Sequence, residues 1–399
     1  NYSLGFTGNT LSVTPALLTL TADSLSKVYG QANPTLSYTA TGFKLSDTAS
    51  VITTAPTLGT LATASTAVGS AAITIEAADA GTNYTLAYVP GTLSIDPRTI
   101  TVGADAQSKV YGDALPALTY TVGGLGLVNG DTLSGALATS ATASSSVGDY
   151  AIDQGTLAAS SNYSLGFTGN TLSVTPALLT LTADSLSKVY GQANPTLSYT
   201  ATGFKLSDTA SVITTAPTLG TLATASTAVG SAAITIEAAD AGTNYTLAYV
   251  PGTLSIDPRT ITVGADAQSK VYGDALPALT YTVGGLGLVN GDTLSGALAT
   301  SATASSSVGD YAIDQGTLAA SSNYSLGFTG NTLSITPASL SVTANNANRT
   351  YDGQPFSGGA GVTYSGFVLG ETATSLAGAL SYSGTSQGAV NVGTYSIVP

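Results

Sequence analysis

An internal repeat without a single difference constrains this sequence more than any other feature. The segment that opens the chain restarts at Asn162 and at Asn323, 161 residues apart each time. Residues 1–161 and 162–322 are identical, and the third copy begins to differ at Ile335. Self-similarity at a fixed period is the signature of structural units that stack in an array, each contacting its neighbours. We therefore expect a tandem array rather than one large domain.

Each 161-residue unit consists of two related halves, which a short anchor motif marks. The string Ser-Lys-Val-Tyr-Gly occurs once in each half of both copies, and the last segment carries a variant with Arg349 and Tyr351. Its four copies lie at 26–30, 108–112, 187–191 and 269–273. We therefore predict modules in the order A-B-A-B-C. Their bounds are 1–15 for the closing segment of a preceding module, 16–97 for module A, 98–176 for module B, 177–258 for the A copy, 259–337 for the B copy and 338–399 for a truncated module C.

The position of these bounds predicts that the sequence is a window on a longer protein. Residues 1–15 match the closing segment of a B module, and module C stops where its own closing segment should follow. We expect the secretion signal and any functional tip to lie outside the window.

Short alternating segments predict strands throughout each module. Residues 16–22 form an extended apolar run, and Leu36 and Tyr38 fall on one face of another segment. Residues 83–88 and 92–95 resemble a hairpin around Pro90-Gly91. No helical periodicity extends over ten or more residues. Six or seven short strands in about 80 residues predict an all-β fold, a linear array of small immunoglobulin-like β-sandwich modules. A β-grasp module with one short helix is the alternative.

The composition excludes several classes of function. Only 8% of the residues are charged and the net charge is −13, which disfavours binding to nucleic acid or to an anionic membrane surface. The absence of Cys excludes disulfides, zinc–thiolate sites and thiol catalysis. The absence of His leaves Ser and Thr without an activating base. No apolar run approaches the roughly 20 residues that cross a bilayer, so we expect no membrane insertion.

Carboxylates raise two further hypotheses, a glycosidase and a calcium site. A glycosidase needs one cleft with two acids, whereas the acids here recur in every module without a unique pair. We therefore predict that the protein is not an enzyme and uses no cofactor. Calcium usually binds a dense Asp/Asn/Gly loop, and none is present. The remaining candidate calcium ligands are Glu76, Asp79, Asp96 and Asp105.

A set of charged and aromatic residues recurs at equivalent positions of successive modules. One interpretation is a ligand-binding charge repeated along the array. The other is a structural role, such as a cross-strand or loop-anchoring pair, which we favour because five equal copies suit structure better than chemistry. The set comprises Lys27, Tyr29, Gly30, Asp47, Asn83, Tyr84, Lys109, Tyr111, Gly112, Asp131, Asn162, Tyr163, Arg349, Tyr351 and Glu371.

The Lys-Val-Tyr-Gly anchors, the Tyr351-Asp352-Gly353 variant and the closing Asn-Tyr…Gly-Thr-Leu-Ser pattern resemble the MBG-type repeats of bacterial adhesins. The Tyr-Gly and Tyr-Asp-Gly forms are subtypes of those repeats. They occur in large biofilm exoproteins similar to filamentous haemagglutinin, often exported by two-partner secretion. The resemblance covers all five modules and implies an extracellular location, at the cell surface or in the biofilm matrix.

The function that this resemblance implies is an extended stalk that projects a distal binding region of the adhesin. The alternative is a repeated lectin-like module that binds exopolysaccharide along its length. We expect the neighbouring modules of the same chain to be the partners of each module. Exopolysaccharide or a host or bacterial surface would be bound through regions outside this window.

Overall fold

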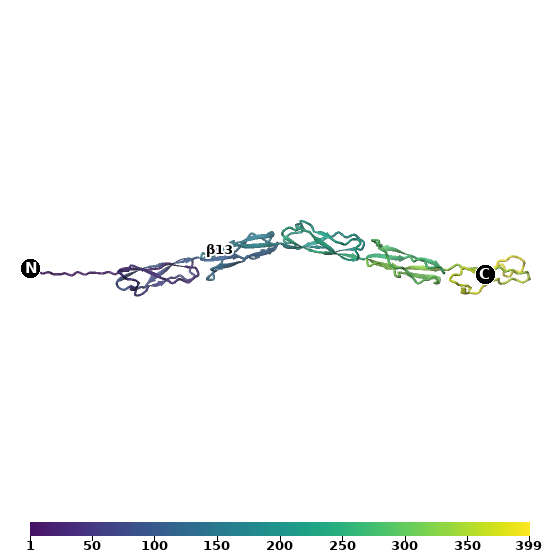
Figure 1. The fold of residues 1–399 in the computed structure, drawn as a ribbon, viewed down its shortest axis with the longest axis horizontal. Helices are drawn as coiled ribbons and strands as arrows, with labels where there is room; N and C mark the ends of the chain where they lie inside the picture. The colour runs from purple at the N-terminus through teal and green to yellow at the C-terminus, as the bar shows by residue number, and fades with distance from the viewer. The chain divides into compact units, whose positions relative to one another are not determined.

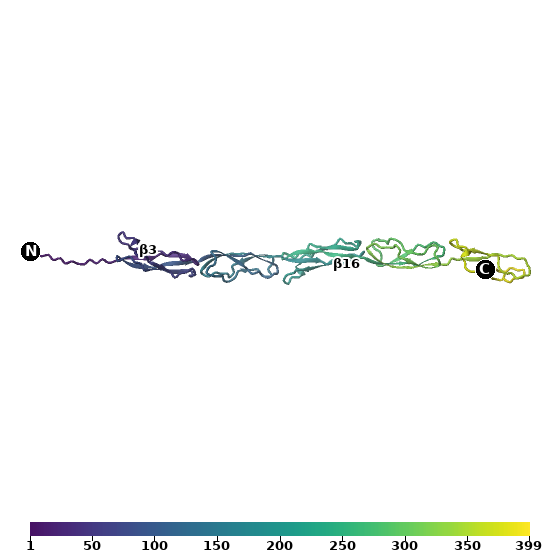
Figure 2. The same cartoon turned by 90° about the horizontal axis from the view of Figure 1, so that it is seen from below.

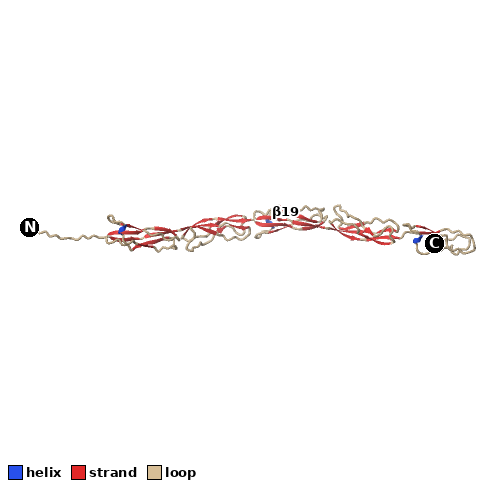
Figure 3. Ribbon diagram, turned by 60° about the horizontal axis from the view of Figure 1, so that its bottom comes forward, coloured by secondary structure: helices blue, strands red, loops and turns tan.

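The computed structural model describes residues 1–399, and almost all of its regular structure is strand (Figure 3). The only helices are three single turns of 3-10 helix, Ala49–Val51, Ala210–Val212 and Ala373–Ser375. The chain divides into two compact units. The first comprises Asn1–Thr180, Ala201–Ala216 and Ala239–Ala248, and the second comprises Leu181–Thr200, Pro217–Ala238 and Tyr249–Pro399.

Module A, in the first unit, is a sandwich of two sheets (Figures 1 and 2). One sheet has the strand order β3-β1-β6 and the other has the order β2-β7-β5-β4. The strands are β1 (Ala16–Ala22), β2 (Leu25–Val28), β3 (Tyr38–Thr41), β4 (Thr57–Gly59), β5 (Gly69–Glu76), β6 (Tyr84–Val89) and β7 (Gly91–Asp96). The sandwich predicted from the sequence is therefore confirmed. The β-grasp alternative is wrong, because no helix lies across either sheet.

The core of module A follows from the two-residue period of its strands. Alternate side chains of a strand point to opposite faces, so Leu18, Leu20 and Ala22 of β1 all enter the space between the sheets. The opposite sheet contributes alternating aliphatic side chains from β5 and β7, and these are at most 6% exposed. Full burial of one such side chain contributes about 1.5–3 kcal/mol. The core therefore holds the two sheets together face to face.

The hairpin predicted around Pro90-Gly91 is wrong. β6 pairs with β1 in one sheet, whereas β7 pairs with β2 and β5 in the other, so the chain changes sheets at this turn. Gly91 allows the change, because a Cβ at this position would lie 2.5 Å from the carbonyl oxygen of Ala22. The Pro-Gly pair marks a close crossing of two backbones.

Module B repeats this design with sheets β10-β8-β13 and β11-β12-β14-β9. Its strands are β8 (Arg98–Ala104), β9 (Gln107–Val110), β10 (Tyr120–Gly124), β11 (Ala138–Thr139), β12 (Gly148–Asp153), β13 (Tyr163–Thr168) and β14 (Asn170–Thr175). Only Pro97 separates β7 of module A from β8 of module B. Proline fixes its own φ and biases the preceding residue to extended geometry, which suits a strand that leads directly into the next.

The A copy has the same seven strands as module A. They are β15 (Ala177–Ala183), β16 (Leu186–Val189), β17 (Tyr199–Thr202), β18 (Thr218–Gly220), β19 (Gly230–Glu237), β20 (Tyr245–Val250) and β21 (Gly252–Asp257). Within the second unit, four of them form the sheet β16-β21-β19-β18. That sheet has the order found in the corresponding sheet of module A.

The B copy, in the second unit, repeats the sheets of module B as β24-β22-β27 and β23-β28-β26-β25. Its strands are β22 (Arg259–Ala265), β23 (Gln268–Val271), β24 (Tyr281–Gly285), β25 (Ala299–Thr300), β26 (Gly309–Asp314), β27 (Tyr324–Thr329) and β28 (Asn331–Thr336). Module C has one two-stranded sheet, formed by β29 (Ser341–Ala344) and β30 (Val362–Ser365).

Residues 1–15 show how far strand formation depends on partners. They are exposed and carry no strand. The identical sequence at 162–176 forms β13 and β14, where β8, β9 and β12 pair with it. Local propensity is the same in both places, so the pairing decides the structure.

Candidate functional site: the junction between modules

The anchor lysine of each module is buried and ties two loops together. Lys27 lies on β2, is 5% exposed, and donates to the carbonyl oxygens of Gln31 and Thr63 and to Oδ1 of Asn33 at 2.6–3.3 Å. Lys109 on β9 is 7% exposed and donates to the carbonyl oxygens of Asp113 and Ala143. These acceptors are uncharged oxygens of the lysine's own module. The contacts place both lysines inside their modules, as loop anchors.

The tyrosine and the acid of the repeated set meet between modules A and B. Tyr29 follows β2 and is 3% exposed. Its hydroxyl donates to Oδ2 of Asp131 in module B at 3.0 Å, and the hydroxyl of Tyr163 donates to the same oxygen at 2.7 Å. The two rings meet edge to face, with centroids 5.5 Å apart. One carboxylate thus joins one tyrosine from each module, and we call this arrangement the junction lock.

Polar contacts to the backbone surround the junction lock. The backbone amide of Val68 in module A donates to Oδ1 of Asn162 in module B at 3.0 Å. Arg98 donates through Nε to the carbonyl oxygen of Gly126 at 2.8 Å and through Nη1 to that of Tyr29 at 3.4 Å. Buried charges and amides are stable only when their hydrogen bonds are satisfied, and these contacts satisfy them.

The glycine of the anchor motif makes room for the neighbouring module. Gly30 has φ +82°, a conformation that side chains disfavour. A Cβ at this position would lie 2.5 Å from Cγ2 of Val128 in module B. The apolar core of module A continues across this contact to Ile100 and Tyr163 of module B. The two modules are therefore packed against each other rather than joined by a free tether.

The same arrangement recurs at the following junctions. Within the first unit, Asp208 accepts from Tyr111 at 3.1 Å and from Tyr245 at 2.7 Å. Within the second unit, Asp292 accepts from Tyr190 at 2.9 Å and from Tyr324 at 2.7 Å. Before module C, the hydroxyl of Tyr272 donates to Oε1 of Glu371 at 2.8 Å. The lock is thus a property of the repeat and not of one pair of modules.

Burial and the shared carboxylate make the junction tyrosines harder to ionise. Burial is the largest cause that raises the pKa of Tyr163 above 10.0, and the Asp131 carboxylate raises it further. The same two causes raise the pKa of Tyr111, Tyr245 and Tyr324. A tyrosinate would lose its donor hydrogen and face a carboxylate at hydrogen-bond distance. The lock therefore requires neutral tyrosines.

The Tyr-Gly motif also relates this chain to a known protein family. The model of the MBG domain of YGX type matches residues 18–94, 100–173, 179–255, 261–334 and 340–399. The chain belongs to the MBG domain family. The tyrosine of each of the first three Tyr-Gly anchors is one of the two tyrosines of a junction lock, as Tyr29 is in the first. MBG domains are typical of extracellular adhesin-like proteins, and the family is not a known family of enzymes.

Other comparisons add little. No curated protein matches the chain. Among solved structures, Drosophila N-cadherin EC1-4 is 10% identical with a TM-score of 0.19, covering 67% of this chain and 83% of that chain. Sidekick-1 immunoglobulin domains 1-4 are 11% identical with a TM-score of 0.21, with the same two coverages of 67% and 83%. No helix has the length and hydropathy needed to cross a bilayer.

Not every residue of the repeated set lies in a lock. In the first MBG domain, Tyr84 donates to Asp47 at 2.7 Å, but Asp47 and Asn83 are exposed. In the last, Arg349 pairs with Asp352 and Tyr351 is 64% exposed, unlike the buried Lys27 and Tyr29. Residues at equivalent positions of the modules therefore differ in burial and in their hydrogen-bond partners.

Two junction contacts have no counterpart in the sequence prediction. Arg98 was not among the predicted residues, although its copy Arg259 donates in the same way to Gly287 and Tyr190. The recurring Asp-Pro-Arg string at both A-to-B linkers is the signal that could have found it. The second contact is the ion pair of Lys205 with Asp113 at 2.8 Å, for which no pattern in the sequence gave a signal.

The candidate calcium ligands are dispersed. Oδ1 and Oδ2 of Asp79 accept from Gly81 and Thr53, Asp96 accepts from Ser94, and Asp105 accepts from Thr121. Glu76 ends β5 with its side chain exposed. No group of three or more acidic side chains is placed to share one cation. The structure therefore does not bring these four residues together.

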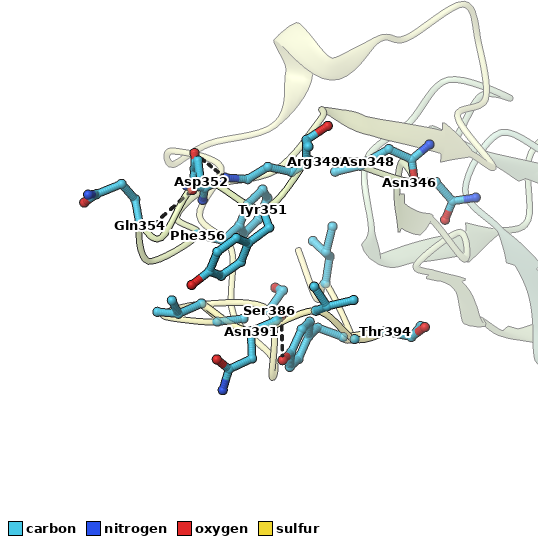
Figure 4. Close-up of a pocket in the computed structure, with 18 of the residues that line it drawn as sticks. Asn346, Asn348, Arg349, Tyr351, Asp352, Gln354, Phe356, Ser386, Asn391 and Thr394 are labelled. Carbon is cyan, nitrogen blue, oxygen red and sulfur yellow. Dashed lines mark hydrogen bonds and ion pairs between the residues drawn. The ribbon is translucent and has the colours of Figure 1, made fainter.

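A cavity of about 410 Å³ lies in module C (Figure 4). Residues 344–354 line one side of it and residues 386–397 the other. By sequence these segments match β2 with its following loop and the start of β5. In the first MBG domain, β7 lies between those two elements. By this correspondence, the cavity lies where β7 lies in the first MBG domain.

Proposed function

We propose that this chain is an extended spacer of a bacterial surface or biofilm-matrix adhesin, and that it holds a distal binding region away from the cell. The observation that carries the proposal is the recurrence of the junction lock. At three successive junctions, one aspartate accepts from two tyrosines of different modules. In the proposed function, these contacts limit the movement between the modules that they join, which is what a spacer requires and what a free tether lacks.

The chemistry of the repeated residues supports a spacer over the lectin-like alternative. A glycan site needs exposed aromatic rings and free polar groups, but Tyr29 and Tyr163 are at most 8% exposed and both donate to Asp131. The four anchor lysines, Lys27, Lys109, Lys188 and Lys270, are at most 7% exposed and so cannot present their charge to an anionic polysaccharide. We propose no catalytic residue, cofactor or calcium ion for this stretch. Its proposed partners are the neighbouring modules.

Replacement of the first repeat in the full-length adhesin tests the proposal. Deletion of residues 16–176 should reduce adhesion at a distance while the affinity for the isolated ligand stays unchanged. The matched control replaces the same 161 residues with an unrelated folded segment of equal length. A spacer predicts that the control restores adhesion. Ligand affinity that falls in proportion to the repeats removed, with no rescue by the control, would show that the modules themselves bind.

A further inference from the structure

Two long strands of module A pair in parallel with one register through both sheets. The opening strand consists of β1 and β2, and the closing strand consists of β6 and β7. Ala16 lies beside Tyr84 and Thr21 beside Val89 in the first sheet, and Leu25 lies beside Leu93 in the second. In both sheets, each residue of the opening strand pairs with the residue 68 positions later in the chain. The two strands therefore change sheets together and remain paired.

This pairing sets the direction in which tension acts on the module. The chain enters at the start of the opening strand and leaves at the end of the closing strand. Because the strands are parallel, these two points lie at opposite ends of the paired strands. Tension along the chain therefore slides one strand past the other. The hydrogen bonds of a parallel ladder are evenly spaced, so the force is shared among them rather than applied to one bond at a time.

The paired strands are also protected from water. β1 is the central strand of its sheet, between β3 and β6, and β7 lies between β2 and β5. Leu18, Leu20 and Leu93 are fully buried, and Ile95 is 2% exposed. The apolar core therefore shields the inner face of these bonds from water. A ladder buried in this way should rupture cooperatively.

From this geometry we propose that each complete module is a shear clamp, which resists tension applied along the chain. Module B keeps one register in the same manner, with Arg98 beside Tyr163 and Gln107 beside Leu172. In the B copy, Arg259 lies beside Tyr324 and Gln268 beside Leu333. The proposal rests on the proposed spacer function and deepens it, since an adhesive spacer transmits force from the ligand to the cell.

Pulling one module in two directions tests the clamp. The chain has no Cys, so handles attach only at introduced positions. Thr14→Cys with Thr99→Cys pulls module A along the chain and loads the ladder in shear. Thr14→Cys with Asn83→Cys pulls from one end of the ladder and separates the same bonds pair by pair, beginning at Ala16 and Tyr84. Each variant is the whole chain of residues 1–399, in optical tweezers.

The clamp predicts a severalfold higher rupture force for the Thr14/Thr99 pair than for the Thr14/Asn83 pair. Equal thermal unfolding of the two variants shows that the difference arises from direction and not from stability. Pulling the whole chain through cysteines introduced at its two ends, Asn1→Cys with Pro399→Cys, should give the same high-force events. Equal rupture forces in the two directions would overturn the clamp. The spacer function would stand in that case, because the segment-replacement experiment tests it separately.

Discussion

At the scale of single residues, the aspartate of the junction lock can be tested by substitution. Asp131→Ala removes the acceptor of two tyrosine hydroxyls, one of which belongs to a side chain only 3% exposed. A buried donor left without a partner costs about 1–3 kcal/mol. We expect Asp131→Ala combined with Asp292→Ala to lower the free energy of urea unfolding by that amount per B module.

The matched control for this prediction removes the same charge elsewhere in the B modules. Asp149 and its copy Asp310 lie exposed on β12 and β26. Asp149→Ala with Asp310→Ala should change the unfolding free energy by less than about 0.5 kcal/mol. An equal loss in both double variants would show that net charge, and not the lock, sets the stability.

Alkaline pH should open the junctions without mutation. Because the folded-state pKa of Tyr163 and Tyr324 is raised above 10.0, their contribution to stability is fully present below pH 10.0. It is lost as the pH rises through the folded-state pKa. Tyrosinate absorbance during a pH titration, followed together with unfolding temperature, should show both changes above pH 10.0. Tyr163→Phe with Tyr324→Phe should weaken this alkaline loss, and an unchanged loss would exclude the two tyrosines as its cause.

The anchor glycine provides a test in which backbone strain is held constant. Gly30 and Gly81 both have positive φ, +82° and +69°, but only Gly30 faces a neighbouring module. Alanine in such a conformation costs roughly 1–2 kcal/mol. Gly30→Ala should cost more than Gly81→Ala, because its Cβ would also displace Val128. Equal losses in urea unfolding would mean that the contact between the modules contributes nothing measurable.

At the scale of elements, the buried lysine joins loops that the strands alone would leave free. Lys27→Met with Lys188→Met keeps the apolar stem and leaves three oxygen acceptors per A module without their donor. We expect a loss of about 1–3 kcal/mol in the A modules. Hydrogen exchange should show faster exchange in residues 31–33 and 60–64. Unchanged exchange there would contradict the loop-anchoring role.

The sequence predicts the elements better than their pairing. The extended apolar run located the strand at 16–22, because a strand that packs in a core needs apolar side chains whatever its partners are. The hairpin at Pro90-Gly91 was wrong because a turn motif does not record whether the strands on either side stay in one sheet. Whether β6 and β7 share a sheet depends on their partners β1 and β2, which lie 68 residues earlier in the chain.

The candidate site was predictable in its members but not in its assembly. Repetition pointed to Tyr29, Asp131 and Tyr163 as residues with a common role. It could not show that Tyr29 meets an aspartate 102 residues away in another module. Identical copies of a residue carry no information on which copy contacts which. The packing of Val128 on Gly30 could not be predicted from the sequence for the same reason.

At the scale of the whole molecule, we expect locked junctions to make the chain an extended spacer. The paired strands of one module cover 13 residues, from Ala16 to Val28, or about 40 Å at ~3.3 Å per residue. Five modules in line would span on the order of 200 Å, with a radius of gyration of roughly 60 Å. A compact protein of this length would have about 21 Å.

Small-angle X-ray scattering of residues 1–399 tests this claim most directly. We expect a radius of gyration near 60 Å, from strands of ~3.3 Å per residue laid end to end. We expect a smaller value for the variant with Asp131, Asp208 and Asp292 all changed to Ala, because unlocked junctions bend. A radius of gyration near the compact value of about 21 Å would contradict the spacer, as would an extended chain whose dimensions ignore all three substitutions.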